Sequence, residues 1–327
     1  MTTKLYDTLG IGNAIVDVLS HVSDDFIAAQ KLGKGTMTLV DEARSKQLYS
    51  LIGPATECSG GSVANTMAGI ASLGGKGAFI GKVADDQLGK IFAHDLQSVG
   101  VRYHSKPAPG AQPSTANCLV LVTPDAQRTM ATYIGACALL SENDIDEPLI
   151  AQARTVYIEG YLWNEAHNKA AIRKAISLAR GYGAQVAFTL SDTFCVNTHR
   201  DEFLSLVQND LDLLFANEAA IKALTGAMDA EEAITAARGL CPTVAITMSE
   251  KGSVVVTNEH TFRAPAKPVA RLVDTTGAGD LFAAGFLHAK AEGKSLQACA
   301  ELGNRCAGEI IQQMGARAMT PLKSLVA

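Results

Sequence analysis

Residues 274–280 read Asp-Thr-Thr-Gly-Ala-Gly-Asp and are followed by an apolar, helical run over 281–287. A glycine-rich turn that leads into a helix offers unpaired N–H groups and the positive end of the helix dipole, so it predicts an anion site. An aspartate that only capped this helix would compete with a bound phosphate. If Asp280 faces an acceptor hydroxyl group, it can instead take the proton as a phosphoryl group arrives. The alternative is a glycine turn whose aspartate is favoured by the dipole alone.

Two earlier segments carry polar groups that suit a hydroxylated substrate. Gly60 and Gly61 precede a helical pattern, so backbone N–H groups there could meet substrate oxygens, and Asn65 could point into the same cleft. Asn13 and Asp17 flank an apolar strand, and a carboxylate such as that of Asp17 suits the vicinal hydroxyls of a sugar ring. The alternatives are a tight structural turn at the glycines and an edge-strand aspartate that faces water.

Two familiar phosphate motifs are excluded by single residues. Gly293-Lys-Ser295 resembles the end of a P-loop, but His288 stands where that motif needs glycine. Gly10-Ile-Gly12 begins like a dinucleotide fingerprint, but Ile15 stands at the position of its third glycine, which disfavours a dehydrogenase.

Composition narrows the class of protein further. The chain has 327 residues, 47% hydrophobic and 19% charged, with a net charge of −5. No basic face or membrane span is indicated, so we expect neither nucleic acid nor membrane as a partner, and a small-molecule substrate. The seven cysteines form no C-x-x-C pair and the N-terminus has no apolar signal segment, which together indicate a cytoplasmic protein without disulfides or zinc.

Apolar, β-rich runs alternate with helical patterns from about residue 77 onward. Strands are predicted at 77–83, 118–123, 155–158, 185–190, 211–216, 243–248 and 253–257. Many of these runs are apolar on both faces, as a buried parallel sheet requires. Helical stripes lie between them, with Gly100 as one helix stop and Ser295 as the N-cap of the last long helix. The pattern predicts an α/β fold with a doubly wound, mostly parallel sheet flanked by helices.

The first sixty residues and the segment 101–123 differ from this pattern. They hold short alternating runs with Pro and Gly, and strands are plausible at 14–19, 36–40 and 102–104. We predict one domain over residues 1–327 with a small, discontinuous β-sheet subdomain at about 13–20, 34–41 and 101–123.

Taken together, these segments resemble the ribokinase-like (pfkB) family of carbohydrate and purine kinases. The stretch from Gly60 through Gly89 resembles the family's first signature, and 274–280 resembles its second, in matching order and spacing over nearly the whole chain. The runs at 12–17, 128–130 and 188–194 are most similar to the adenosine kinase branch.

This resemblance implies a role for each matching residue. Asp280 would be the general base, the N–H groups of Gly277, Ala278 and Gly279 the anion hole, and Arg128 a cation beside the transferring phosphoryl group. The acceptor would be held by Asn13, Asp17, Gly60, Gly61 and Asn65. The nucleotide or its phosphates would contact Asn217, Thr247, Gly252 and Asn304. The small sheet would be the lid. For Arg128 an exposed loop position, and for the last four residues an ordinary capping, strand or helix-surface role, are the alternatives.

Two departures from the family pattern concern metal and nucleotide. The family's Asn-x-x-Glu, which helps to organise magnesium, reads Asn217-Glu-Ala-Ala220, so Glu218 is the nearest metal candidate. The family's Thr-x-Gly-x-x-Gly loop carries Ser249 at its first glycine. The implied cofactors are ATP and Mg²⁺, with a monovalent cation as a possible addition.

The resulting hypothesis is ATP-dependent phosphorylation of the hydroxymethyl group of a nucleoside, with adenosine converted to AMP. The same chemistry on ribose or fructose is the first alternative, and a nonenzymatic ligand-binding or regulatory homologue is the second. A purine needs an apolar or aromatic slot in the lid, whereas a free sugar needs more polar partners.

Overall fold

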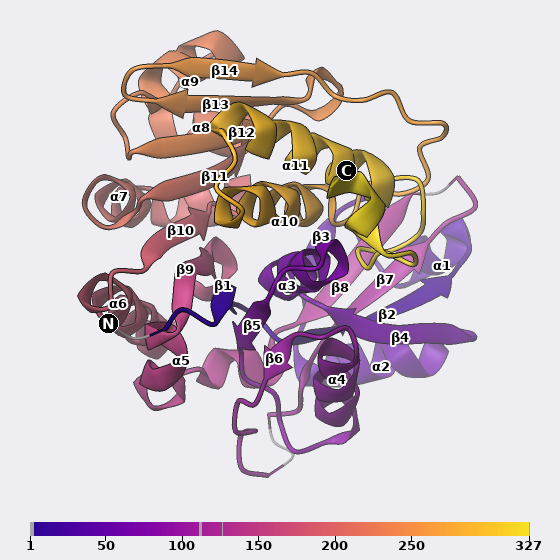
Figure 1. Ribbon diagram of the computed structural model, residues 1–327. Coiled ribbons are helices and arrows are strands. Elements are labelled where there is room, and N and C mark those ends of the chain that lie inside the picture. Colours follow the sequence, from indigo (N-terminus) through magenta and orange to yellow (C-terminus); the bar gives the residue numbers. More distant parts are fainter. Residues whose placement is uncertain (1–2, 111–112, 126, 327) are drawn as a thin grey trace.

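The structure, a computed structural model, describes residues 3–110, 113–125 and 127–326. Within these ranges a nine-stranded sheet forms the centre of the molecule, in the order β14-β13-β12-β11-β10-β9-β1-β5-β6 (Figure 1). Its strands are β1 (Tyr6–Ile11), β5 (Gly77–Ile80), β6 (Arg102–Tyr103), β9 (Ala153–Glu159), β10 (Gln185–Thr189), β11 (Leu213–Asn217), β12 (Thr243–Thr247), β13 (Ser253–Thr257) and β14 (Thr261–Ala264).

In this sheet the neighbouring strands β6, β5, β1, β9, β10, β11 and β12 are parallel, and β13 and β14 add antiparallel strands at one edge. The chain winds outward in both directions from β1, through β5 and β6 on one side and through β9 and its neighbours on the other. Doubly wound sheets bind ligands beyond the carboxyl ends of the strands where the winding reverses. That point lies between β1 and β9, which end at Ile11 and Glu159.

Helices cover both faces of this sheet (Figure 1). The helices are α1 (Asp24–Ala29), α2 (Glu42–Leu51), α3 (Ser62–Leu73), α4 (Gln87–Ser98), α5 (Glu147–Ala151), α6 (Ala166–Gly181), α7 (Thr193–Asp210), α8 (Glu218–Thr225), α9 (Ala230–Ala237), α10 (Ala278–Ala291) and α11 (Leu296–Ile310). Short 3-10 helices lie at Gly135–Leu139, Glu142–Asp144, Gly160–Leu162, Ser249–Lys251 and Leu322–Val326. One apolar core lies beneath α5 to α9, and another beneath α3, α4, α10 and α11.

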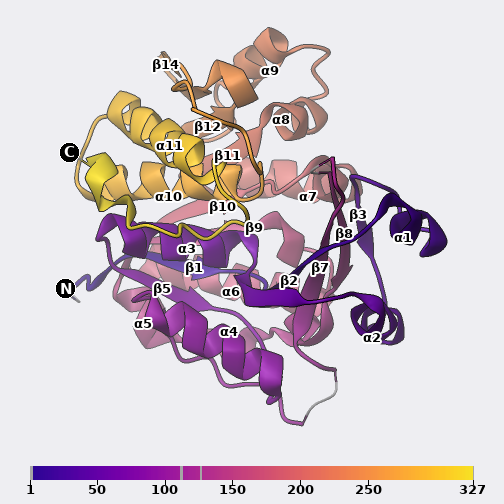
Figure 2. The same cartoon turned by 90° about the vertical axis from the view of Figure 1, so that its right-hand side faces the viewer.

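A second sheet of five strands lies beside the first, in the order β3-β8-β7-β2-β4 (Figure 2). Its strands are β2 (Ile15–His21), β3 (Met37–Leu39), β4 (Ala55–Gly60), β7 (Ala116–Val122) and β8 (Arg128–Tyr133). Alternate residues such as Val16 and Leu119 are fully buried and share a core with Ile27 of α1 and Leu48 of α2. The opposite face carries Asp17 and is turned toward the start of α10.

The predicted doubly wound sheet is confirmed, and a strand forms within or across each of the seven predicted ranges. The helix stop at Gly100 and the N-cap at Ser295 are also found. One strand was assigned to the wrong sheet: Arg102–Tyr103 pairs with β5 of the large sheet, so the part of 101–123 that joins the small sheet begins at Ala116. Residues 111–112 of that predicted range lie outside the described residues.

The sequence analysis also missed strands. β1 lies inside the large sheet, between β9 and β5, although it falls in the segment assigned to the small one, because its glycine and polar residues mask its burial. β4 and β8 complete the small sheet outside the predicted ranges. Across the described ranges we find no helix of the length and apolarity that a bilayer crossing needs.

Candidate active site

The turn before α10, where the anion hole was predicted, contains a glycine in a left-handed conformation. Gly277 is the N-cap with φ 76°, a left-handed conformation that favours glycine, and a Cβ there would lie 2.6 Å from the Cβ of Ala316. Ala278 donates its N–H to the carbonyl of Thr275 at 3.3 Å. The N–H groups at 277–279 lie in the turn where a helix leaves donors without helical partners. The turn can therefore offer backbone donors to a phosphate, although Ala278 would first have to release Thr275.

Asp280 lies in the first turn of α10 and is held by donors from α3. Its Oδ1 accepts from Ser62 Oγ at 2.6 Å, and its Oδ2 accepts from Asn65 Nδ2 at 2.9 Å. Burial raises the pKa of this carboxyl, opposed by those two hydrogen bonds and by the charge of Arg317. A carboxylate has about four lone-pair directions. Asp280 can therefore accept a further hydrogen bond, for example from an alcohol, while it keeps the hydrogen bonds from Ser62 and Asn65.

The start of α3 is packed so closely that only glycine fits. Gly61 has φ 90°, and a Cβ there would lie 2.3 Å from the carbonyl oxygen of Asn13. A Cβ on Gly60 would lie 2.3 Å from Asp17 Oδ2. Asn65, in the first turn of α3, has its Oδ1 shielded from solvent and without a hydrogen-bond partner among the described residues. This oxygen can accept a hydroxyl hydrogen from a substrate.

Glu159, at the end of β9, connects the β1–β2 turn to α3. Its Oε1 accepts the N–H of Asn13 at 2.9 Å, and its Oε2 accepts the N–H of Val63 at 3.0 Å. It is 1% exposed, and burial raises its pKa to about 7 despite both bonds. The sequence analysis missed this residue. Its available signal was an acidic residue that ends a buried parallel strand.

Asp17 lies on the inner face of the small sheet, between Cys58 of β4 and Cys118 of β7. Burial raises its pKa to about 7, and Asp280 adds to the rise while Arg317 opposes it. Beside Asp17 this face carries an apolar cluster of Cys118, Val120 and Val122 with Ile15, Leu19 and Met130, and it also carries Arg128 and Thr132 of β8.

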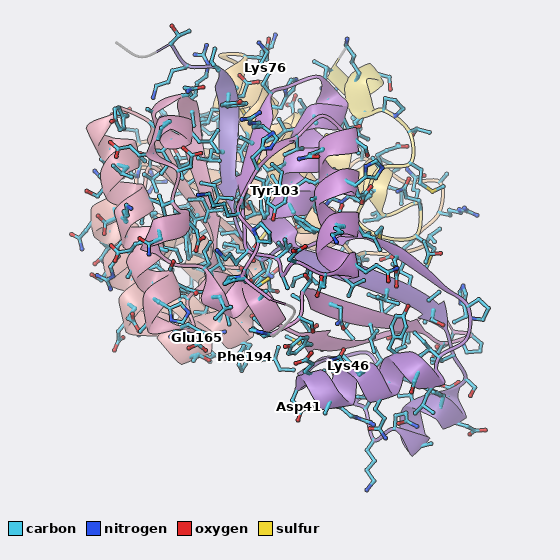
Figure 3. The ribbon with its side chains drawn as sticks, turned by 90° about the horizontal axis from the view of Figure 1, so that it is seen from below. Asp41, Lys46, Lys76, Tyr103, Glu165 and Phe194 are labelled. Atoms are coloured by element: carbon cyan, nitrogen blue, oxygen red, sulfur yellow. The ribbon has the colours of Figure 1, made fainter. Side chains whose placement is uncertain are left out.

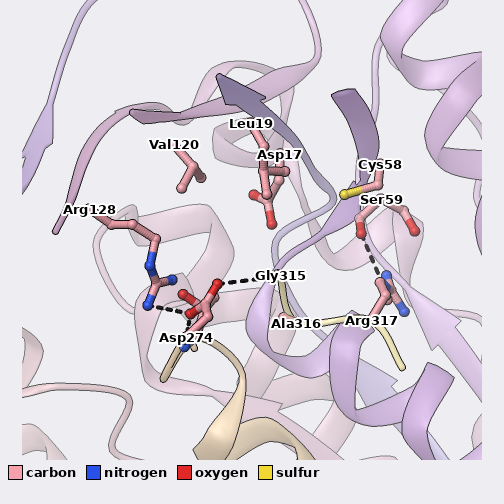
Figure 4. A pocket seen from close by; sticks show the side chains of 11 residues that line it. Asp17, Leu19, Cys58, Ser59, Val120, Arg128, Asp274, Gly315, Ala316 and Arg317 are labelled. Atoms are coloured by element: carbon pink, nitrogen blue, oxygen red, sulfur yellow. Dashed lines mark hydrogen bonds and ion pairs between the residues drawn. The ribbon is translucent and has the colours of Figure 1, made fainter. Parts of the chain in front are cut away.

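Arg128 joins the small sheet to the turn before α10. Its guanidinium forms an ion pair with the fully buried carboxylate of Asp274, which also accepts the N–H groups of Thr276 at 2.6 Å and Gly315 at 2.8 Å. Figure 4 shows this pair on one side of a small cavity, with Asp17 on another. The cavity has a volume of about 10 Å³, room for a single water. Arg128 must leave Asp274 before it can contact a phosphoryl group.

Arg317, which the sequence analysis also missed, borders the same cavity (Figure 4). It donates from Nε to the carbonyl of Ser59 and from Nη1 to that of Ala64, each at 2.9 Å. Its Nη2 is shielded from solvent and has no partner among the described residues. No local spacing marks this residue, since it follows the last α-helix in a short irregular segment.

Three of the predicted nucleotide residues gather at the carboxyl ends of β11 and β12. Asn217 and Thr247 are register partners, and Gly252 follows in the turn to β13. Gly252 has φ 93°, and a Cβ there would lie 2.1 Å from the carbonyl oxygen of Ala264. Asn217 also caps α8 by accepting the N–H of Ala220 at 2.7 Å. Ser249 adopts φ 51°, the left-handed region in which the family pattern has glycine.

Asn304 and the metal candidate Glu218 both lie on helices. Asn304 is buried in α11 and donates to the carbonyls of Ala264 at 2.8 Å and Pro265 at 3.3 Å, which ties α11 to the end of β14. Glu218 lies in the first turn of α8. In the part of the chain that the structure describes, no three His, Cys, Asp or Glu side chains gather as a metal site.

Residues 40–323 match the family described as pfkB family carbohydrate kinase. The chain belongs to this family. It is similar to adenosine kinase from Sinorhizobium meliloti, with 46% identity, 98% of each chain covered and a TM-score of 0.93. It is also similar to a probable sugar kinase from Rhizobium etli CFN 42, with 44% identity over 99% and 98% of the two chains and a TM-score of 0.93. Adenosine kinase of Saccharomyces cerevisiae is 26% identical over 93% of this chain and 94% of its own.

Membership of the pfkB family confirms the predicted fold and makes the protein a phosphotransferase that uses ATP and acts on a hydroxyl group of a small molecule. The structure brings Asp280, Asn65 and Ser62 into contact, and it places Asp17 and Gly60 beside them around Arg317. The roles of the individual residues stay predictions.

Proposed function

We propose that this enzyme transfers the γ-phosphoryl group of ATP to the 5′-hydroxyl of adenosine, giving ADP and AMP. The observation that carries the choice of acceptor is the apolar cluster beside Asp17 on the inner face of the small sheet. If the small sheet moves away from the turn before α10 and widens the cavity, a purine ring can lie on Leu19, Val120 and Met130 while its ribose reaches Asp17. A free sugar would leave this apolar cluster without a partner.

An exposed aromatic ring supports the same acceptor. Phe194 is 52% exposed at the start of α7, while Phe188 of the same adenosine-kinase-like run is fully buried. α7 follows β10, so Phe194 lies at the carboxyl-end edge of the large sheet, where ligands bind. Figure 3, which views the molecule from below, shows its side chain on the same visible face as α2, marked by Lys46. An exposed ring at this edge can stack on a base.

In this proposal Asp280 takes the proton of the 5′-hydroxyl as the phosphoryl group is transferred. Its raised pKa brings it closer to neutral pH, where a general base is most effective. The N–H groups of Gly277, Ala278 and Gly279 hold the transferring phosphoryl oxygens, with Arg128 as an added cation once released from Asp274. Asp17 and Asn65, with the backbone at Asn13, Gly60 and Gly61, hold the ribose hydroxyls.

The nucleotide would lie near Asn217, Thr247 and Gly252 at the ends of the neighbouring strands. Magnesium keeps most of its ligands as water and phosphate oxygens and needs only one or two carboxylates. Glu218 at this edge could therefore supply a carboxylate to Mg²⁺ bound to ATP, where the ion would neutralise phosphate charge. A monovalent cation, a lid movement of the small sheet and a cytoplasmic location stay as predictions.

The test is ADP release with adenosine, ribose and fructose as acceptors, compared as kcat/KM. We expect adenosine to be preferred. A clear preference for a free sugar would move the protein to the sugar-kinase alternative, and no turnover with any acceptor would favour a ligand-binding homologue.

A further inference from the structure

We infer that Arg317 is a positioning residue for Asp17: its guanidinium holds the Asp17 carboxylate in the charged state that accepts both hydroxyls of the acceptor's diol. The inference rests on the proposed function, because it takes Asp17 as the group that binds the ribose. It assigns a role to a residue outside both motifs of the sequence.

The geometry of Arg317 leaves one donor without a partner. Nε and Nη1 are fixed by the carbonyls of Ser59 and Ala64, so the plane of the guanidinium is set by β4 and α3. Nη2 is shielded from solvent and has no partner among the described residues, although it belongs to a charged group. A buried donor without a partner costs roughly 1–3 kcal/mol. Asp17 lines the same cavity without bonding Nη2, so its carboxylate is the acidic group of the small sheet on which the charge of this guanidinium acts.

Arg317 is itself held in place from two sides. Asp95 of α4 accepts both the N–H and the hydroxyl of Ser59, at 2.8 and 2.5 Å, and thereby fixes the strand whose carbonyl Arg317 binds. On the other side, Ala316 packs against Gly277, and Gly315 donates to Asp274. The segment that carries Arg317 is thus tied to the anion-binding turn.

The charges around Asp17 leave Arg317 as its principal cation. The titratable or charged groups that face Asp17 or the shared cavity are Cys58 on β4, Cys118 on β7, Asp280 on α10, Asp274 in the turn before α10, Arg128 on β8 and Arg317, with Asp95 of α4 behind Ser59. Asp280 disfavours a second negative charge, and both thiols have a raised pKa of about 12, so they stay neutral. Arg128 is neutralised by its pair with Asp274.

The consequence is a pH dependence of acceptor binding. A protonated Asp17 is a poorer acceptor for two hydroxyls than a carboxylate. Burial raises its pKa to about 7 even though the charge of Arg317 opposes the rise. Removal of the charge should therefore raise the pKa further, so that the acceptor is bound well only at higher pH. An adjacent opposite charge commonly shifts a carboxyl pKa by about one unit or more.

The test compares wild type, Arg317→Gln, Arg317→Lys and the surface control Arg263→Met, whose side chain is 54% exposed. Steady-state kcat and KM are measured for adenosine and 2′-deoxyadenosine from about pH 5.5 to about pH 9, which brackets Asp17. In Arg317→Gln we expect the acid limb of kcat/KM for adenosine to move up by about one pH unit, mostly as an increase of about tenfold in KM at the acid end. In Arg317→Lys the acid limb should return most of the way to its wild-type pH. The KM for 2′-deoxyadenosine, which lacks one hydroxyl, should change less than the KM for adenosine.

Several outcomes would overturn the inference. One is a folded Arg317→Gln variant in which the acid limb of the kcat/KM profile does not move. Another is a loss of kcat that is equal at every pH and that persists in Arg317→Lys. Asp17→Asn provides a check that does not depend on the folding of the Arg317 variants: it must abolish the acid limb of KM, and a limb that persists assigns the titration to another group. A wild type inactive on adenosine would instead overturn the proposed function.

Discussion

Replacing Asp280 with asparagine isolates the charge of the proposed base from its shape. In wild type, Ser62 and Asn65 each donate to one carboxylate oxygen. An asparagine at 280 can keep its oxygen toward Asn65 and turn its amide toward Ser62, whose hydroxyl can rotate to accept. We therefore expect the fold to survive with a change in stability of about 1 kcal/mol.

The effect on turnover should be far larger than this change in stability. The amide cannot take a proton, and loss of a general base typically lowers the rate by roughly 10²–10⁴-fold, about 3–5 kcal/mol of barrier. Single-turnover rates with ATP and adenosine, together with thermal unfolding, separate the two effects. Asp25→Asn is the matched control, because Asp25 also lies in the first turn of a helix and is exposed. A near-native kcat in Asp280→Asn would refute the assignment of the base.

Other predictions address the acceptor, the pH dependence and the two departures from the family pattern. Asp17→Ala should weaken adenosine binding by about 1.5–3 kcal/mol and leave ATP binding unchanged in calorimetry; equal losses would assign Asp17 to the fold. Asp17→Asn should gain stability relative to wild type as the pH rises from 3.8 to about 7, because the folded wild type holds this proton more tightly than the unfolded chain does; parallel unfolding curves at all pH values would contradict the buried carboxyl. Ser249→Gly should raise the free energy of unfolding by about 1 kcal/mol by relieving its φ of 51°. Ala220→Glu should unfold the protein rather than lower its magnesium requirement, since Ala220 is 0% exposed; a folded variant with a lower magnesium midpoint would show the opposite.

The last expectation rests on the surroundings of Ala220 in the structure. The spacing Asn217-x-x-Ala220 suggests that a glutamate at 220 would restore metal organisation. The structure shows that the N–H of Ala220 is bonded by Asn217 and that its side chain faces the core. A motif position predicts chemistry only if the local backbone turns that side chain toward the cleft.

The other site residues differ in whether a local sequence pattern marks them. The contact of Asp280 with Asn65 follows from two motifs that each combine glycines with a helix start, and such turns carry a local signal. Glu159 and Arg317 have none, because each is a single charged residue whose partners come from other elements and are mostly backbone atoms. The two-residue strand β6 was misplaced for a similar reason, since its sheet is decided by its partner β5.

The central claim, phosphorylation of adenosine at its 5′-hydroxyl, is tested most directly by a competition. Equal concentrations of adenosine and ribose are mixed with enzyme, magnesium and a limiting amount of ATP, and the phosphorylated products are identified by ³¹P NMR. We predict that the transferred phosphate appears as AMP, with little ribose phosphate, and that Asp280→Asn forms neither at a comparable rate. Ribose phosphate as the main product would contradict the account.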